Sequence, residues 1–226
     1  MLLCLMTGAA GSCIWLWLLR DRLQIAKWMI PVLALLNTAA GVICVRVFAG
    51  LESWGSPLSG GQSLFGGVFL LPVFYFAGSK LFRRRFGDVT DVFAMCTVTT
   101  LVFARVSCII SGCCQGSFLP GSESLRWPTR EMEIIFHIVL LIVLYRKNRK
   151  GDFPGEIWPL YMFSYGIFRF LEEWMREGEQ VFGSMHRGHI WAILSIIAGA
   201  AIYAEIHIQN KARSKSAGRR KDRKIC

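Results

Sequence analysis

The chain has 226 residues, of which 54% are hydrophobic, and a formal net charge of +11, with a mean hydropathy of +0.43. Soluble domains lack long apolar runs, but several runs here reach the roughly 20 residues that cross a hydrocarbon layer about 30 Å thick. The composition therefore excludes an ordinary soluble domain. It predicts an all-α polytopic membrane protein, because membrane-spanning strands would be about ten residues long and strictly alternating.

We predict about seven transmembrane helices in a single domain that covers residues 1–210, followed by a basic tail at residues 211–226. The predicted helices cover Met1–Leu19, Trp28–Gly50, Ser63–Phe82, Val89–Ile110, Glu131–Tyr145, Glu156–Trp174 and His189–Ile208. Basic residues cluster after the first, third and fifth of these segments and in the tail. The positive-inside rule then places the N-terminus outside and the C-terminus in the cytoplasm. The positive charge therefore does not indicate a nucleic acid partner.

The segment after the second predicted helix reads WGSPLSGGQSLFGG, from Trp54 to Gly67. Glycines at a membrane surface let backbone N–H groups approach a ligand closely, which makes this segment a candidate for substrate binding. A tight turn with close helix packing is the alternative. The candidate residues are Ser59, Gly60, Gly61, Gly66 and Gly67.

The fourth predicted helix ends in ARVSCIISGCCQG, from Ala104 to Gly116. Arg105 stands within an apolar run, and Cys108, three residues later, shares its helix face. Cys108, Cys113 and Cys114 have the spacing C-x4-C-C, which is not a standard zinc spacing, so we predict no metal site and no cofactor. A structural thiol cluster, or a disulfide that pins the loop in an oxidising compartment, is the alternative role for these cysteines.

Two later motifs place carboxylates beside the membrane. In PTREMEII, Glu133 is followed at once by apolar residues, where a carboxylate can act as a base or a hydrogen-bond acceptor; stabilisation of the helix dipole is the alternative. In YGIFRFLEEWMRE, Arg169 and Glu173 are four residues apart and share one helix face, and Arg176 and Glu172 extend the charge toward the surface. A plain salt bridge between Arg169 and Glu173 is the alternative to a shared ligand.

Arg46, Arg105 and Arg169 lie in three different predicted helices, toward their outer side. Arginine inside an apolar segment is costly and marks a candidate functional site. Guanidinium groups bind phosphate through paired hydrogen bonds, so these residues predict an outward-facing site for a phospholipid headgroup. Glu133 and Glu173 would orient the arginines or handle protons. For Arg46, snorkelling to headgroup phosphates is the alternative.

The order of these motifs resembles the prolipoprotein diacylglyceryl transferase family. The matching stretches are GVICVR ending at Arg46, SGGQSLFGG from Ser59, ARVSCIISGCCQG from Ala104, PTREME from Pro128, YGIFRFLEEWMR from Tyr165 and GHI from Gly188. They run in family order over most of the chain, and the family has the topology predicted above.

The resemblance implies transfer of a diacylglyceryl group from phosphatidylglycerol to the lipobox cysteine thiol of a prolipoprotein signal peptide. The site would face the outer leaflet of a bacterial plasma membrane, and we expect a monomer. Arginines would hold the phosphate and stabilise it as it leaves, while the acceptor would react as its thiolate. Catalysis is assigned by resemblance to Arg105, Glu133, Arg169 and Glu173. Substrate binding is assigned to Arg46, Ser59, Gly60, Gly61, Gly66, Gly67, Cys108, Gly116 and Arg176.

The chain departs from the family pattern where protons are handled. Phe65 stands where many members have histidine or tyrosine, and Cys108 stands where the family has asparagine. Ser111, Gly112 and Cys113 replace the usual asparagine, glycine and glutamate, and Arg130 and Met132 replace glutamine and tyrosine.

Three functions therefore stay open. The first is a divergent transferase in which Glu133 or Glu173 takes the proton. The second is a paralogue that acts on another lipid or acceptor, or uses Cys108, Cys113 or Cys114 as its own nucleophile. The third is a non-catalytic membrane protein that binds phospholipid.

Overall fold

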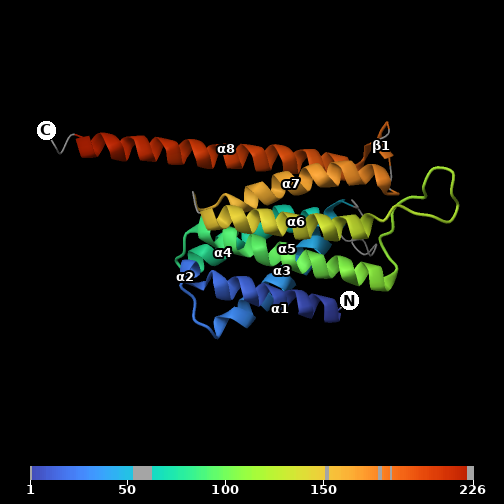
Figure 1. Ribbon diagram of the computed structural model, residues 1–226, viewed down its shortest axis with the longest axis horizontal. Coiled ribbons are helices and arrows are strands. Elements are labelled where there is room, and N and C mark those ends of the chain that lie inside the picture. The colour runs from blue at the N-terminus through green and yellow to red at the C-terminus, as the bar shows by residue number, and fades with distance from the viewer. Residues whose placement is uncertain (1, 53–62, 151–152, 178–179, 184, 223–226) are drawn as a thin grey trace.

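The computed structural model is a bundle of long helices (Figure 1) and describes residues 2–52, 63–150, 153–177, 180–183 and 185–222. The helices are α1 (Leu2–Leu18), α2 (Arg20–Leu23), α3 (Met29–Glu52), α4 (Phe65–Leu81), α5 (Phe86–Ser111), α6 (Thr129–Lys150), α7 (Ile157–Glu172), the 3-10 turn η1 (Glu173–Met175) and α8 (Arg187–Asp222). The strands β1 (Gln180–Phe182) and β2 (Met185–His186) form a small antiparallel hairpin.

A helix covers each of the predicted membrane segments, and the structure is consistent with an all-α membrane protein. Three helices are long and apolar enough to cross a membrane by length and composition, namely Met29–Glu52, Phe86–Ser111 and Arg187–Ala212, and two shorter helices are also apolar. Large apolar side chains point outward from the bundle, including Ile43, Val73 and Ile135, which are 53%, 62% and 63% exposed. Such a surface suits lipid better than water.

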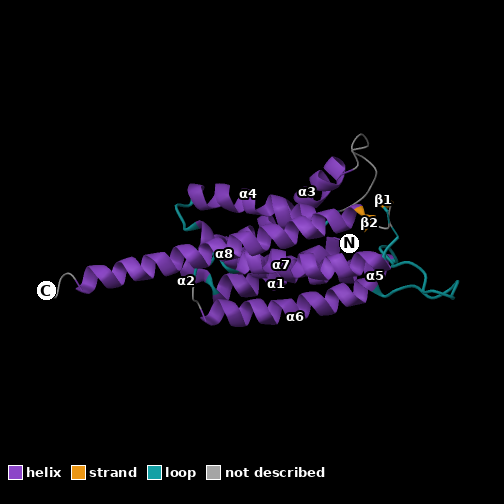
Figure 2. Ribbon diagram, turned by 90° about the horizontal axis from the view of Figure 1, so that it is seen from above, coloured by secondary structure: helices purple, strands orange, loops and turns teal. Residues whose placement is uncertain are grey.

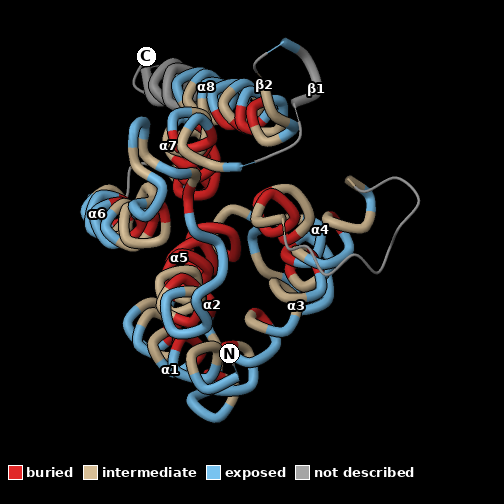
Figure 3. Tube along the Cα trace, turned by 90° about the vertical axis from the view of Figure 1, so that its right-hand side faces the viewer, coloured by how far each residue is buried: buried red, intermediate tan, exposed pale blue. Residues whose placement is uncertain are grey.

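Helix α5 is the centre of the bundle. Its residues from Val89 to Thr99 are buried on every face, as expected of a helix surrounded by others. It contacts α1, α3, α4, α6 and α7, while α7 packs along α8 and α3 packs along α4. Figure 3 shows α5 between α1 and α7, with the buried segments concentrated along α5 and α7.

Asp91 of α5 positions the start of α7. Its carboxylate accepts hydrogen bonds from the backbone N–H groups of Gly155 at 2.8 Å and Ile157 at 2.9 Å. The first N–H groups of a helix have no partner within the helix, so a buried carboxylate that accepts one of them fixes where α7 begins. This contact sets the depth of α7, which carries Arg169 at its other end.

The two ends of the bundle differ. The start of α1 lies at the end that also carries the α5–α6 loop and the β1–β2 hairpin, whereas α8 extends beyond the opposite end, where α2 lies (Figures 1 and 2). At this second end the basic segments meet polar partners, as Arg22 donates to Asn148 at 2.6 Å. Helix α8 continues through Asp222 and so extends past the predicted end of the last apolar segment at Ile208.

Candidate functional site

Six charged side chains from α5, α6, α7, η1 and the residue that follows it form one buried cluster, which we call the arginine–glutamate network. Its members are Arg105, Glu133, Arg169, Glu172, Glu173 and Arg176. Formal charges within it balance, since three guanidinium groups meet three carboxylates. Buried charges are stable only when paired, and this arrangement gives every member an opposite partner.

Arg105 and Glu133 form the central pair. The Arg105 Nε donates to the Glu133 carboxylate, whose side chain is fully buried, while the Arg105 side chain is 8% exposed. Arg176 reaches the other Glu133 oxygen at 3.5 Å. One carboxylate from α6 thus orients guanidinium groups from α5 and from the segment after α7.

Arg169 forms the second half of the network. Its two terminal nitrogens contact Glu172 at 2.6 Å and Glu173 at 2.9 Å, which confirms that Arg169 and Glu173 share a face and pair. Arg176 lies 4.0 Å from Glu172 and so links this half to Glu133.

Gly188 makes room for Glu173. A Cβ atom on Gly188 would lie 2.3–2.5 Å from the Glu173 carboxylate atoms. A side chain at position 188 would therefore displace that carboxylate from Arg169. This glycine, in the first turn of α8, thus helps to position the ion pair of Arg169 and Glu173.

A cavity of about 380 Å³ lies beside the network. Among the network residues, Arg105 lines the cavity, and most of the remaining cavity wall is apolar. The lining residues come from α1, α3, α4, α5, α7 and the loop after α5, and they include Asn37, Thr38, Val42, Val45, Leu64, Gly67, Leu71, Leu101, Arg105, Cys108, Ser111, Cys113, Cys114 and Tyr161. The cavity combines a guanidinium group with an apolar chamber, which suits an amphiphilic phosphate-bearing ligand.

A family model described as prolipoprotein diacylglyceryl transferase matches residues 3–205 of the chain. The chain belongs to this family. The predicted resemblance is therefore confirmed.

Curated relatives carry the name phosphatidylglycerol–prolipoprotein diacylglyceryl transferase. The protein from Polaromonas naphthalenivorans is 29% identical over 170 residues, covering 67% of this chain and 62% of the relative. The protein from Chlorobaculum tepidum is 27% identical over 172 residues, covering 70% and 58%. The protein from Clostridium novyi is 23% identical over 200 residues, covering 77% and 78%. The match to the first two relatives thus spans about three fifths of their length.

The structure divides the family-matched arginines into two groups. Arg105 and Arg169 lie in the network, whereas Arg46 is exposed on α3. Among the described residues, no hydrogen bond or ion pair to the Arg46 side chain is present. The third arginine of the network is Arg176 rather than Arg46. The predicted role of Arg46 in substrate binding stays a prediction, and its exposure is that expected for snorkelling.

The paired glycines of α4 have different surroundings. A Cβ atom on Gly66 would lie 2.2 Å from the Cys44 carbonyl oxygen of α3, whereas one on Gly67 would meet nothing nearer than 3.8 Å. Gly66 therefore permits close packing of α3 on α4, and Gly67 lines the cavity. Ser59, Gly60 and Gly61 lie outside the described residues.

Gly116 holds the loop against η1, the turn that follows α7. Its N–H donates to the Trp127 carbonyl at 3.2 Å, and an added Cβ would lie 2.6 Å from that oxygen and 2.8 Å from the Met175 carbonyl. Arg126 donates to the Gly116 carbonyl at 3.1 Å. The absence of a side chain at Gly116 thus lets the loop after α5 pack closely against Trp127 and Met175, beside the network.

Phe65 packs in the interior beside the network. It is 3% exposed, and its ring centroid lies 5.7 Å from that of Tyr165. The Tyr165 hydroxyl is buried without a hydrogen-bond partner among the described residues, and it interacts electrostatically with Glu133 and Arg169. Tyr165 is thus a buried phenol beside these charges, and its place in the motif YGIFRF gave no indication of this.

Glu172 is another buried residue of the network that the sequence did not identify as a site residue. The sequence suggests that it extends charge toward the surface, but its side chain is fully buried against Arg169. The spacing of three residues from Arg169 is a signal that could have identified the pair. Buried His137 also belongs to this region, since its Nδ1 lies 2.7 Å from the Glu133 carbonyl oxygen.

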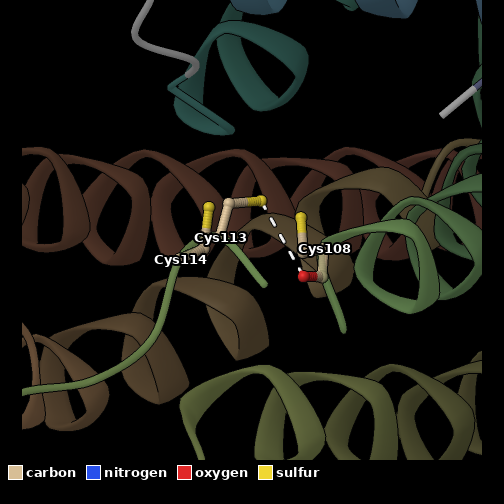
Figure 4. Close-up of side chains that lie close together, drawn as sticks. All are labelled: Cys108, Cys113 and Cys114. Atoms are coloured by element: carbon tan, nitrogen blue, oxygen red, sulfur yellow. Dashed lines mark hydrogen bonds between the residues drawn. The ribbon is translucent and has the colours of Figure 1, made fainter. Parts of the chain in front are cut away.

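Cys108, Cys113 and Cys114 all line the cavity. Their sulfur atoms lie within 4.8 Å of one another, and Figure 4 shows the side chains gathered at the end of α5. A hydrogen bond from the Cys108 thiol lowers the pKa of the Cys114 thiol. Partial burial raises this pKa, and the positive charge of Arg105 lowers it further. The arginine and the thiols therefore share one chamber.

Proposed function

We propose that this chain transfers a diacylglyceryl group from phosphatidylglycerol to the lipobox cysteine thiol of a prolipoprotein. The observation that carries the proposal is Arg105, held by Glu133 at the wall of an otherwise mainly apolar cavity. The names of the curated relatives support it. The acyl chains would occupy the apolar chamber, and the phosphate would contact the guanidinium group.

In the proposed reaction the acceptor thiolate attacks the carbon of the diacylglyceryl group that is bonded to the phosphate oxygen. A carbon–sulfur bond forms, the carbon–oxygen bond breaks, and glycerol phosphate leaves with the electron pair. Negative charge grows on the phosphate oxygens, where positioned guanidinium groups stabilise it. Arg105 makes the direct contact, and Arg169 and Arg176 add positive charge from behind it.

A base must take the thiol proton. Glu133 and Glu173 are the proposed candidates, because Phe65 can neither accept a proton nor donate a hydrogen bond. Glu133 is the better placed of the two, since it contacts Arg105 directly. In this proposal the proton of the acceptor thiol passes to the carboxylate as the sulfur attacks.

The proposed topology has seven crossings, with the N-terminus outside, the C-terminus in the cytoplasm and the network toward the outer leaflet of the plasma membrane. The arrangement of charge supports it, because the basic segments gather at the end of the bundle that is opposite the α5–α6 loop. We also propose that residues 1–210 form one monomeric domain and that residues 211–226 serve as a basic tail.

A second candidate is a transfer in which the chain's own thiol is the acceptor. It is favoured by the position of Cys108, Cys113 and Cys114 in the same cavity as Arg105. Incubation with phosphatidylglycerol would then add a diacylglyceryl mass to the chain itself. Intact-protein mass spectrometry decides this, since an adduct that is lost in the triple serine variant supports self-modification and an unmodified chain excludes it.

Complementation tests the transferase proposal in cells. We expect the chain to restore lipoprotein modification in a bacterial strain depleted of its own transferase, and the Arg105→Ala variant to fail at equal membrane abundance. Rescue by the wild-type chain rules out the non-catalytic lipid-binding function. Failure by a well-expressed wild-type chain, with a working relative as positive control, contradicts transfer to the usual acceptors.

A further inference from the structure

The three thiols at the end of α5 are arranged to act together. Cys108 lies in the last turn of α5, and Cys113 and Cys114 follow just beyond it, with all three sulfurs within 4.8 Å of one another. Cys108 is half-buried, while Cys113 and Cys114 are exposed. A dissolved ion can therefore reach the cluster.

The backbone of the loop brings adjacent side chains to one side. Gly112 and Cys114 have left-handed conformations, with φ of 68° and 57°. In an extended chain the side chains of Cys113 and Cys114 would point to opposite faces, so the turn at Cys114 lets both approach Cys108 (Figure 4). A non-glycine residue rarely adopts this conformation, and such residues cluster at ligand sites.

The main chain around the thiols is already held by other groups. Arg130 donates to the carbonyl oxygens of Cys108 at 3.4 Å and Cys113 at 3.5 Å, and the Thr129 hydroxyl contacts the Cys114 carbonyl at 3.3 Å. These contacts fix the loop through its carbonyl groups. All three cysteines line the cavity, and the Cys113 thiol also donates to the Cys108 carbonyl oxygen at 3.9 Å (Figure 4).

Three sulfurs with this spacing match the chemistry of soft cations. Sulfur ligands lie about 2.3 Å from Zn(II), which places the sulfurs of one site about 4 Å apart, so closure around an ion needs a contraction of less than about 1 Å. Thiolates select Zn(II) and Cu(I), whereas Ca²⁺ and Mg²⁺ prefer oxygen ligands.

We propose that Cys108, Cys113 and Cys114 bind one thiophilic cation, Zn(II) or Cu(I), through three sulfur ligands at the loop end of the cavity. The site lies in the same cavity as Arg105, but metal binding does not depend on the proposed transfer reaction. A bound ion would fix the loop that follows α5 and narrow the chamber that holds Arg105. The spacing of the cysteines in the sequence did not predict such a site, because it carries no information on the turn at Cys114.

Metal binding to the full-length chain tests the proposal directly. The purified protein, reduced with a phosphine in detergent, is titrated with Zn(II) and, separately, with Cu(I), each against a coloured chelator. We expect one equivalent of at least one of the two ions to remain after gel filtration, with a sulfur shell near 2.3 Å in X-ray absorption. The Cys108→Ser, Cys113→Ser, Cys114→Ser variant should bind at least 100-fold more weakly.

A matched variant separates this site from general thiol binding. Replacing Cys4, Cys13 and Cys226 with serine removes the same number of thiols elsewhere and should leave the affinity within twofold. The single variant Cys113→Ser should weaken binding at least tenfold with unchanged helical circular dichroism. Equal binding by the wild type and the triple variant of the cluster, or no retained ion of either kind in the wild type, overturns the proposal.

Discussion

At the scale of single residues, Arg105 carries both the proposed chemistry and part of the stability. Replacing it with alanine leaves Glu133 fully buried, with Arg176 as its remaining direct partner at 3.5 Å. Breaking a buried ion pair by removing one partner costs about 3–5 kcal/mol. We therefore expect Arg105→Ala to lower the free energy of unfolding in detergent by about 3 kcal/mol.

Arg46→Ala is the matched control for that measurement. Arg46 is exposed and lies outside the network, and surface substitutions of this kind stay within about 0.5 kcal/mol. Unfolding of both variants can be followed by circular dichroism in denaturant. Equal, small losses of stability in the two variants would show that the Arg105–Glu133 pair is not a structural support.

A substitution of Gly188 tests how Glu173 is positioned. A methyl group at this position would overlap the Glu173 carboxylate, so Gly188→Ala should cost about 1–3 kcal/mol of stability by displacing Glu173 from Arg169. In a Glu173→Ala background the same change should cost much less. A double-mutant cycle measures this coupling, and additive effects of the two substitutions would contradict the proposed steric role.

At the scale of elements, the paired glycines of α4 separate packing from ligand contact. Gly66→Ala places a methyl group against the α3 backbone at Cys44 and should destabilise the bundle by about 2–3 kcal/mol. Gly67→Ala meets no such contact and should keep its stability or gain up to about 1 kcal/mol. Because Gly67 lines the cavity, its variant should instead alter the apparent affinity for phospholipid.

The comparison needs two readouts on each glycine variant. Unfolding in detergent reports the packing effect, and binding of a fluorescent phosphatidylglycerol reports the effect on the cavity. If both variants lost the same stability, the close approach of α3 and α4 would not be centred on Gly66. If Gly67→Ala left lipid binding unchanged, Gly67 would not contact the ligand.

At the scale of the whole molecule, the network and the thiols lie toward one end and the basic segments toward the other. The proposed orientation predicts that a membrane-impermeant maleimide labels the wild-type chain in intact spheroplasts more than the variant that lacks Cys108, Cys113 and Cys114. A fluorescent protein fused to the C-terminus should fluoresce in the cytoplasm. The opposite orientation would be indicated if the two chains were labelled equally before cell lysis and differed only after lysis.

Much of this architecture could be predicted from the sequence, because hydropathy and length report directly on apolar helices. Spacing along one helix also predicted the Arg169–Glu173 pair correctly. The partner of Arg105 could not be found in this way, because Glu133 is 28 residues away on another helix. Only the packing of α5 on α6 brings the two together.

Other features depended on helix rotation and on backbone turns. Helix α3 is apolar on most faces, so its sequence does not show that Arg46 points outward while Asn37 lines the cavity. The burial of Glu172 follows from the way α7 ends against the network. The left-handed turn at Cys114 has no sequence signal, since glycine is the residue that usually marks such a conformation.

We propose that Arg105 and the cavity beside it transfer a diacylglyceryl group to a thiol. The most direct measurement is mass spectrometry of a lipobox peptide incubated with the purified chain and phosphatidylglycerol. We predict a gain of one diacylglyceryl group per cysteine, matched by released glycerol phosphate, and at least a 100-fold slower gain with Arg105→Ala. A folded wild-type chain that gives no phosphatidylglycerol-dependent gain, or an Arg105→Ala variant that reacts equally fast, would contradict the account.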